Sequence, residues 1–179
     1  MAKKDENIKV LDFLEHGRPG SKDEPIAQGI GTEYYNLLEV VMRDDKRPKG
    51  GEEVYIGEGD RDKVKYIKDK IEYDDLTGNA KKELQYVLKA LIQEKEDEFV
   101  DFFNNATPVT PRRHAFELLP GIGKKHMEKL LDERHKEEFE SFEDIKERVS
   151  SLPDPEKLVV DRIIDELKGD AKHNLFLSQ

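Results

Sequence analysis

The first part of the chain, up to Tyr73, alternates short apolar runs with charged or turn-forming stretches, a pattern typical of short strands. The apolar runs lie at 8–14, 26–30, 34–42, 53–56 and 64–73. No stretch between them is long enough for a crossover helix, so we expect the strands to pair antiparallel. The charged stretch 43–51 contains a proline and a Gly-Gly pair and predicts a long hairpin loop. The economical arrangement is a small antiparallel β-barrel or sandwich, and we prefer a five-stranded OB-like barrel.

From Asn79 onward the apolar spacing changes to steps of three and four residues, which is typical of an amphipathic helix. The residues with this spacing are Leu84, Val87, Leu88, Leu91, Ile92, Phe99 and Phe103. We expect Asn79 to be the N-cap and the helix to be broken near residues 94–98. The helix must end before Pro108, because proline lacks the amide donor that a helix needs.

The last part of the chain is predicted to be helical, with turns between its helices. The expected helices are at 112–119, at 124–136, from Ser141 onward, and at 156–167. The segment Pro120-Gly121-Ile122-Gly123 separates the first two helices. Ser141 begins a capping-box sequence, and Gly169 is expected to end the last helix.

Two segments of this helical part, 119–131 and 152–164, are faintly similar to each other. Each begins with Leu-Pro, and their apolar residues recur at an offset of 33. Asp154 and Glu156 stand in the second segment where the first has glycine. We interpret them as two helix–hairpin–helix units about a pseudo-twofold axis. The first kept a phosphate-binding turn, and the second is structural.

These changes of pattern predict an α+β protein in three parts. An OB-like β-barrel domain is expected at residues 1–78, and a linking amphipathic helix at 79–106. An all-α domain with two helix–hairpin–helix units is expected at 107–179.

Composition narrows the classes of function. The chain has 179 residues, 40% of them charged, a net charge of −10 and no cysteine. The lack of cysteine excludes a disulfide scaffold, a thiolate metal site and a cysteine nucleophile. No stretch approaches the roughly 20 apolar residues that cross a bilayer, and the N-terminal sequence has no apolar signal region. We therefore expect a cytoplasmic protein with no membrane partner.

The charge is unevenly distributed. Residues 107–135 contain six basic and four acidic side chains and form the only positive part of an acidic chain. The same part holds the most distinctive motif, Leu118-Leu119-Pro120-Gly121-Ile122-Gly123-Lys124-Lys125. An acidic surface repels nucleic acid, so a positive segment beside such a motif indicates where a polyanion would bind.

Each residue type in this motif has a physical reason. Gly121 and Gly123 allow positive φ and a close backbone approach, and the turn opens directly into a helix N-terminus. Free N–H groups and the helix dipole favour an anion at such a terminus. We expect Ile122 to point inward, and Lys124 and Lys125 to add charge. The predicted ligand is a backbone phosphate, contacted without reading the bases. The alternative is a bare Pro-Gly turn with no ligand.

The motif resembles the helix–hairpin–helix motif of DNA- and RNA-binding proteins that lack sequence specificity. Met127 stands where related motifs often have alanine, which predicts a wider crossing of the two helices. The order of a tyrosine-rich β part, a long helix, TPRRHAFELLPGIGKKH and SFEDIKERV resembles an uncharacterised archaeal family. That resemblance implies an OB-like domain before a helix–hairpin–helix domain and a role in nucleic-acid binding.

Other candidate residues are less distinctive. Arg112 and Arg113 are predicted to contact a second phosphate, with an exposed basic turn as the alternative. Four tyrosines are expected either to stack against bases or to pack in the core: Tyr34, Tyr35, Tyr55 and Tyr66. The histidines lack the spacing of a zinc site, and no nucleophile elbow, P-loop or supported carboxylate pair is present. We expect no catalytic residue, no metal and no cofactor.

The sequence therefore predicts a protein that binds DNA or RNA by its backbone through Pro120, Gly121, Ile122, Gly123, Lys124, Lys125, Arg112 and Arg113. The OB-like domain is expected to help by binding single strands or RNA. One alternative is an acidic adaptor that binds proteins within an RNA- or DNA-processing complex. A less favoured alternative is a metal-dependent nucleic-acid-processing enzyme.

Overall fold

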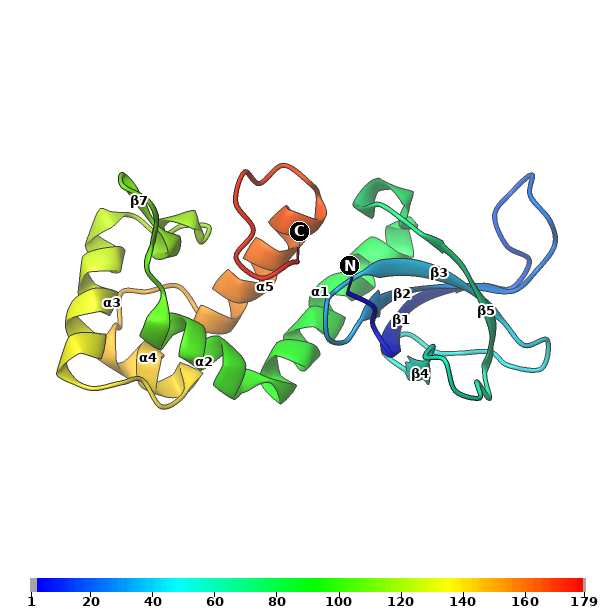
Figure 1. Cartoon of the computed structure of the whole chain (residues 1–179), viewed down its shortest axis with the longest axis horizontal. Coiled ribbons are helices and arrows are strands. Elements are labelled where there is room, and N and C mark those ends of the chain that lie inside the picture. Colours follow the sequence, from blue (N-terminus) through cyan, green and yellow to red (C-terminus); the bar gives the residue numbers. More distant parts are fainter. Residues whose placement is uncertain (1–2, 179) are drawn as a thin grey trace. The chain divides into compact units, whose positions relative to one another are not determined.

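A computed structural model describes residues 3–178 and shows an α+β protein with two compact units (Figure 1). The first unit contains the chain up to Val87 and the last residues from Leu177, and the second is Leu88–Phe176. The division falls inside helix α1 (Gly78–Glu94). The three predicted domains, at 1–78, 79–106 and 107–179, stay a prediction.

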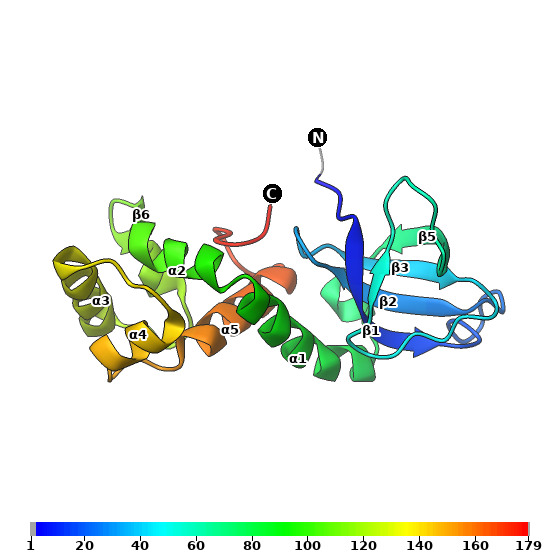
Figure 2. The same cartoon turned by 90° about the horizontal axis from the view of Figure 1, so that it is seen from below.

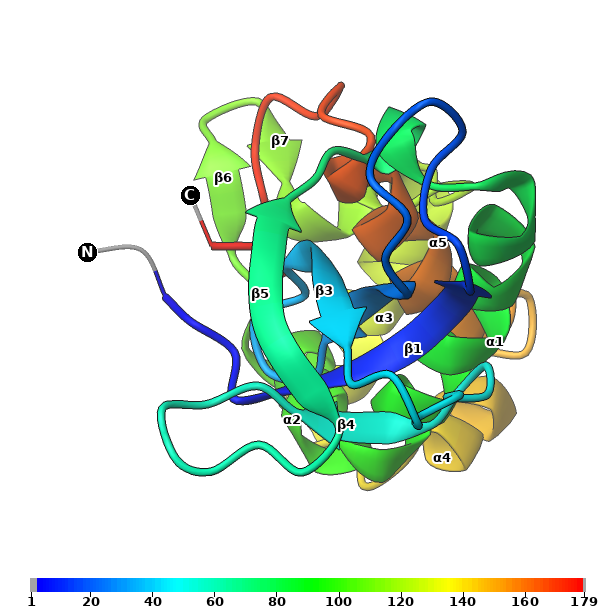
Figure 3. The same cartoon turned by 90° about the vertical axis from the view of Figure 1, so that its right-hand side faces the viewer.

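The first unit is built on five antiparallel strands, as the apolar runs predict. They are β1 (Asn7–Leu14), β2 (Ile26–Gly31), β3 (Leu37–Met42), β4 (Glu53–Tyr55) and β5 (Val64–Lys70). Their order in the sheet is β4-β1-β2-β3-β5, and the sheet curls around a core of residues such as Ile8, Val10 and Val40 (Figures 2 and 3). Ile8 lies opposite both Gly31 and Val54 in the two ladders of β1.

The sheet is open, so the expected barrel is not closed by strand pairing. Strands β4 and β5 are its two edges, and no ladder joins them in the described part of the chain. The coarse prediction of a small antiparallel sheet is confirmed, with an open half-barrel in place of a closed one.

The third strand begins later than the apolar run predicts. The segment before Leu37 forms a turn, in which Tyr35 has a φ of 60°. The Asp5 carboxylate stabilises this turn by accepting hydrogen bonds from the amides of Glu33 (2.9 Å) and Tyr34 (2.7 Å). Gly31 leaves room for that carboxylate, because a Cβ there would lie 1.8 Å from an Asp5 oxygen.

The second unit is mostly helical, as predicted. Its helices after α1 are α2 (Glu96–Asn105), α3 (Lys124–Lys136), α4 (Phe142–Arg148) and α5 (Pro155–Leu167). The predicted break in the long helix is confirmed at Lys95, between α1 and α2. Ser141 caps α4 by accepting a hydrogen bond from the Asp144 amide at 3.0 Å. Gly169 has a φ of 82° just after α5.

The predicted N-cap of the long helix is wrong. The Thr77 hydroxyl, rather than Asn79, accepts a hydrogen bond from the amide of Ala80 at 3.0 Å. Asn79 lies inside the helix and is exposed. The same Thr77 hydroxyl donates to Asp12 at 2.6 Å, so a tertiary contact selects the cap residue.

The predicted helix at 112–119 is also wrong. A hairpin of β6 (Pro108–Thr110) and β7 (Arg113–His114) occupies its first part, and a 3-10 helix, η2 (Ala115–Leu118), follows. The Thr110 hydroxyl accepts from the amides of Arg112 (3.3 Å) and Arg113 (3.0 Å). Such local side-chain bonds hold a turn in place of a helix.

The helical unit is packed around aromatic rings. Phe103 stacks on Phe116 with 5.8 Å between ring centroids, and the ring centroids of Phe176 and Phe102 are 5.0 Å apart.

Among residues 3–178, no helix is both long enough and apolar enough to span a membrane.

Candidate nucleic-acid interface

The turn between η2 and α3 is held from inside by apolar residues. Leu119 is 1% exposed and Ile122 is 8% exposed, which confirms that Ile122 points inward. The Ile122 amide donates to the Leu119 carbonyl at 3.2 Å and closes the turn. Gly121 has a φ of 85°, the left-handed region that favours glycine. The turn is therefore anchored in the core while its glycines remain at the surface.

Helix α3 begins with amides that have no internal acceptor. Its N-cap is Gly123, which has no side chain to cap the helix, and its first turn contains no acidic residue. The first intrahelical bond runs from the Met127 amide to the Gly123 carbonyl at 3.1 Å. Within residues 3–178, the amides of Lys124, Lys125 and His126 donate no hydrogen bond.

The surroundings of this helix start are basic and open. Gly121, Gly123, Lys124 and Lys125 are all exposed. The amides and the helix dipole give a partial positive charge, to which the two lysines add full charges. An external anion can therefore bind where most helices bind their own cap residue.

The second turn of the faint repeat offers an internal comparison. The amide of Leu152 donates to Val149 at 3.0 Å, as that of Leu119 donates to Phe116 at 3.1 Å, in the same register of the repeat. Helix α5, however, is capped by Asp154, whose carboxylate accepts from the Glu156 amide at 3.1 Å. The start of α5 is thus capped by a carboxylate of the chain itself. The corresponding start of α3 has no such side chain.

The two predicted arginines are exposed, with Arg112 in the turn of the β6–β7 hairpin and Arg113 at the start of β7. The Arg113 guanidinium donates to the carbonyl of Glu117 at 3.2 Å, so it lies on η2, shortly before Pro120. Arg112 makes no side-chain hydrogen bond in the described residues. The Arg113 side chain therefore contacts η2, which leads into the turn at Pro120. Arg112 remains at the tip of the β6–β7 hairpin.

Buried His114 and half-buried Arg134 pack beside the turn, and the sequence analysis missed both contacts. His114 Nδ1 accepts from the Phe116 amide at 3.0 Å, which requires a neutral ring nitrogen. Burial lowers the pKa of His114, and the charge of Arg134 lowers it further. Arg134 itself lies over the Phe116 ring at 5.5 Å, and burial lowers its pKa.

The sequence analysis also missed Arg162. It is paired with Glu166 at 2.9 Å, and its guanidinium also donates to the Leu118 carbonyl at 3.0 Å. The signal was present in the sequence, since two opposite charges four residues apart lie on the apolar side of the last helix.

The tyrosines of the first unit differ in their surroundings. Tyr35 is buried, and Lys3 lies over the Tyr34 ring at 5.4 Å. Tyr66 is exposed but donates its hydroxyl proton to Glu24 at 2.7 Å, a bond that raises the pKa of Tyr66. Tyr55 lines a cavity.

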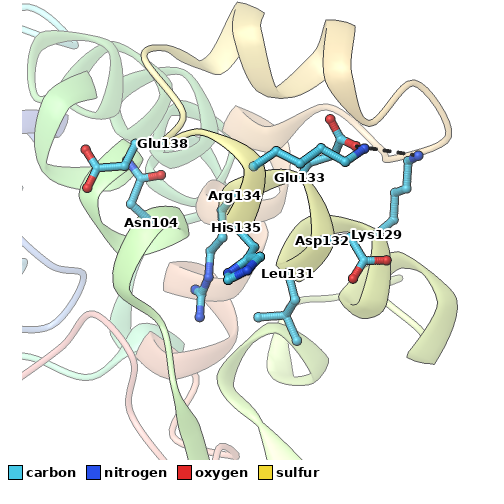
Figure 4. Close-up of a pocket in the computed structure, with 9 residues that line it drawn as sticks. Asn104, Lys129, Leu131, Asp132, Glu133, Arg134, His135 and Glu138 are labelled. Carbon is cyan, nitrogen blue, oxygen red and sulfur yellow. Dashed lines mark hydrogen bonds and ion pairs between the residues drawn. The ribbon is translucent and has the colours of Figure 1, made fainter.

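A hollow of about 760 Å³ borders the later part of α3, and Glu133 in its lining is surrounded by basic side chains (Figure 4). Glu133 contacts Lys136 at 2.7 Å, Lys129 at 3.8 Å and Arg148 at 3.6 Å. The hydrogen bond from Lys136 lowers the pKa of Glu133. Within the described residues, no cluster of three or more His, Asp or Glu side chains is arranged to hold a metal ion.

The fold is that of a two-unit α+β protein, and within residues 3–178 helix α3 begins at a glycine with no side-chain cap. Residues 4–178 match the family described as proteins of unknown function, DUF655, and the chain belongs to that family. It is 43% identical over 168 residues to an uncharacterized protein of Methanocaldococcus jannaschii, covering 94% of this chain and 76% of that protein. The crystal structure of Af1531 from Archaeoglobus fulgidus has a TM-score of 0.92 and 46% identity, covering 97% of this chain and 100% of that one.

The expected resemblance to an uncharacterised family with archaeal members is thus confirmed. The names of these relatives mention no ligand, so the nucleic-acid role implied by the resemblance stays a prediction.

Proposed function

We propose that the chain binds nucleic acid through its sugar–phosphate backbone, without sequence specificity. In this proposal η2, the turn and α3 form a helix–hairpin–helix motif, and the open sheet is an OB-like domain that contributes to binding single strands or RNA. A backbone phosphate accepts hydrogen bonds from the free amides at the start of α3, and Lys124 and Lys125 neutralise its charge. Arg113 is placed to contact a neighbouring phosphate.

The observation that supports this proposal best is the uncapped start of α3. Most helices use a Ser, Thr, Asp or Asn side chain there, and this chain does so at α4 and α5. Glycine at the α3 cap leaves the amides open beside Lys124 and Lys125, which form no ion pair among residues 3–178. An anion from outside stabilises such a start in the way that a cap side chain would.

The proposed binding is weak and sensitive to salt. Contacts to two or three phosphates give a log–log salt slope of about −2 to −3 on duplex DNA. The net charge of −10 repels the polyanion elsewhere on the surface. We therefore expect a dissociation constant in the micromolar range or weaker.

The test is fluorescence anisotropy with labelled single- and double-stranded oligonucleotides over a salt series. The variant Lys124→Glu/Lys125→Glu is expected to weaken binding at least tenfold and to flatten the salt slope. Acidic residues suit the first turn of a helix, so α3 is expected to remain folded. The control is Lys81→Glu/Lys82→Glu, an equal change of charge near the start of α1.

Unchanged binding by the Lys124→Glu/Lys125→Glu variant rules out the turn as the site. Equal weakening by the control variant also rules it out, because the effect is then one of net charge alone. If the wild-type protein binds no oligonucleotide at low salt, the adaptor alternative is favoured.

A further inference from the structure

The first unit contains a cavity of about 600 Å³ that the proposed turn site does not use. Residues of both edge strands line it, including Tyr55 at the end of β4 and Ile67 and Lys70 of β5. The segment before β1 contributes as well. This volume is within the usual range of small-molecule sites, which is roughly 300–1,000 Å³.

Apolar side chains form part of the lining. Ile67 is 39% exposed, one of few large apolar residues so exposed in residues 3–178. Leu38 and Ile56 line the cavity beside it. An exposed β-branched side chain costs free energy in water, at about 25 cal/mol per Å² of apolar surface. A ligand with a flat apolar part would remove that surface from water.

Tyr55 is held in a fixed position in the same cavity. Its hydroxyl accepts a hydrogen bond from the Gly59 amide at 3.0 Å. The backbone at Gly57 packs onto the ring, since a Cβ there would lie 2.3 Å from the hydroxyl oxygen. The two glycines thus let a loop close over the tyrosine and fix its ring. A fixed aromatic ring is a suitable platform for stacking a base.

The cavity lining also contains basic residues that form no ion pair among residues 3–178. Lys4, Arg61 and Lys70 line the cavity, and none has an ion pair in the described residues. The Arg61 Nε donates to the Gly57 carbonyl at 2.8 Å, which orients its guanidinium and leaves the terminal nitrogens available. These cations favour an anionic group on the ligand.

Acidic residues in the lining limit the charge of that ligand. Asp5 is already engaged, since it accepts from the Asn36 side-chain amide at 2.7 Å and from three backbone amides. Glu6 and Glu58 add two further negative charges. The balance of charges suits a single phosphate better than a triphosphate.

We propose that this cavity binds one nucleotide unit, with the base against Tyr55 and Ile67 and the phosphate at Arg61 and Lys70. The unit comes either from a free nucleoside monophosphate or from a single strand whose base is unpaired. The second source rests on the proposed function, because the turn would then hold the backbone of the same class of ligand. In that case the cavity would bind a base with its phosphate, and the turn would bind backbone phosphates of the same kind of polymer.

The test is a titration of the full-length, ¹⁵N-labelled protein, followed by the NMR shifts of its backbone amides. The probes are uridine 5′-monophosphate, inorganic phosphate and single-stranded oligouridylate. Uridine monophosphate is expected to shift the amides of residues 55–58 and 67–70 and to saturate, whereas phosphate alone does not saturate over the same range. Absence of saturable shifts at millimolar nucleotide overturns the proposal.

The two sources are distinguished in the same experiment. At least tenfold tighter binding of the oligomer than of the monophosphate at these amides supports the single strand. Equal binding supports the free nucleotide. Both interpretations apply only if the NMR shifts occur at the amides of residues 55–58 and 67–70.

A matched pair of variants tests the basic residues. Lys70→Glu is expected to weaken binding of uridine monophosphate at least tenfold, and Lys65→Glu, exposed on the same strand but outside the lining, is expected to leave it unchanged. Arg61→Gln is a second variant, should Lys70→Glu disturb β5. Equal weakening by Lys65→Glu overturns the proposal.

The turn variant separates this inference from the proposed function. Lys124→Glu/Lys125→Glu is expected to keep the binding of uridine monophosphate. If that variant also binds oligomers like the wild type, the proposed function fails and the cavity assignment stands. If no nucleotide binds the cavity while the turn variant loses oligomer binding, the cavity assignment alone fails.

Discussion

The Arg162 guanidinium donates a hydrogen bond to the carbonyl oxygen of Leu118 at 3.0 Å, which joins helix α5 to the residue two positions before Pro120. The same guanidinium is paired with Glu166 at 2.9 Å, and the two side chains are 10% and 0% exposed. Glu166 also accepts from the amides of Leu175 and Phe176, so one buried pair fixes both the turn and the C-terminal segment.

Arg162→Met is therefore expected to destabilise the helical unit by about 3–5 kcal/mol, because it leaves the buried Glu166 carboxylate without its cation. Calorimetry and urea denaturation measure this loss. The matched control is Lys157→Met, which removes an exposed pair with the same spacing on the same helix, where Lys157 is 70% exposed. The control should change stability by less than about 1 kcal/mol. A similar loss in both variants would contradict the role given to Arg162.

Gly123→Asp should make the start of α3 resemble that of α5. A side chain fits, since no atom lies within 4 Å of a Cβ at this position and the backbone is extended, as in most cap residues. A capping carboxylate is expected to raise stability by about 0.5–2 kcal/mol. It should also lower the affinity for oligonucleotides, since it competes with phosphate for the same amides. Thermal denaturation and anisotropy, measured on one sample, check the two opposite effects.

Mild acid is expected to destabilise the helical unit through His114. Burial holds the pKa of this residue below its ordinary value of 6.5, so the unfolded chain binds a proton more readily than the folded one. The stability contributed by the neutral ring is therefore fully present above pH 6.5 and is lost as the pH falls below that value towards the folded pKa.

Denaturation at pH 7.5 and 5.5 measures this loss, with His114→Asn as the comparison. Asparagine accepts the same local hydrogen bond without titrating, so the variant should lose most of the difference between the two pH values. The lowered pKa values of Glu24 and Glu133 act in a more acidic range, because both lie below the ordinary value of 4.5. An equal pH dependence in the variant would assign the effect to other groups.

Thr77→Ala is expected to cost about 1 kcal/mol, because it removes the cap of α1. Asn79→Ala should cost less than about 0.5 kcal/mol, since Asn79 is an exposed residue within the helix. Circular dichroism during thermal unfolding compares the two variants. The reverse order would restore Asn79 as the residue that stabilises the helix start.

Local sequence signals predicted those features that depend on neighbouring residues. The charged run near Lys95 predicted the break between α1 and α2, and Ser141 predicted the start of α4. The inward position of Ile122 followed from its place between two glycines. In each case the residues that determine the structure are only a few positions apart.

The features that were missed depend on contacts between distant residues. Thr77 caps α1 while it also contacts Asp12, 65 positions away. The segment 112–119 has a helical pattern, yet Thr110 and the paired strands determine its first half. The cavity in the first unit is lined by residues from the N-terminal segment, β3, β4 and β5, so no single sequence motif predicts it.

Strand β5 is an edge of the sheet and pairs on one side only within residues 3–178, and its sequence contains Lys65, Lys68 and Lys70. Lysines on such a strand hinder a second chain from adding its own strand there, because the pairing would bury ammonium groups that hold water, although Lys68 is itself paired with Glu24 at 2.9 Å. These lysines therefore disfavour edge-to-edge association at β5. Substituting these lysines by threonine would remove that protection against self-association.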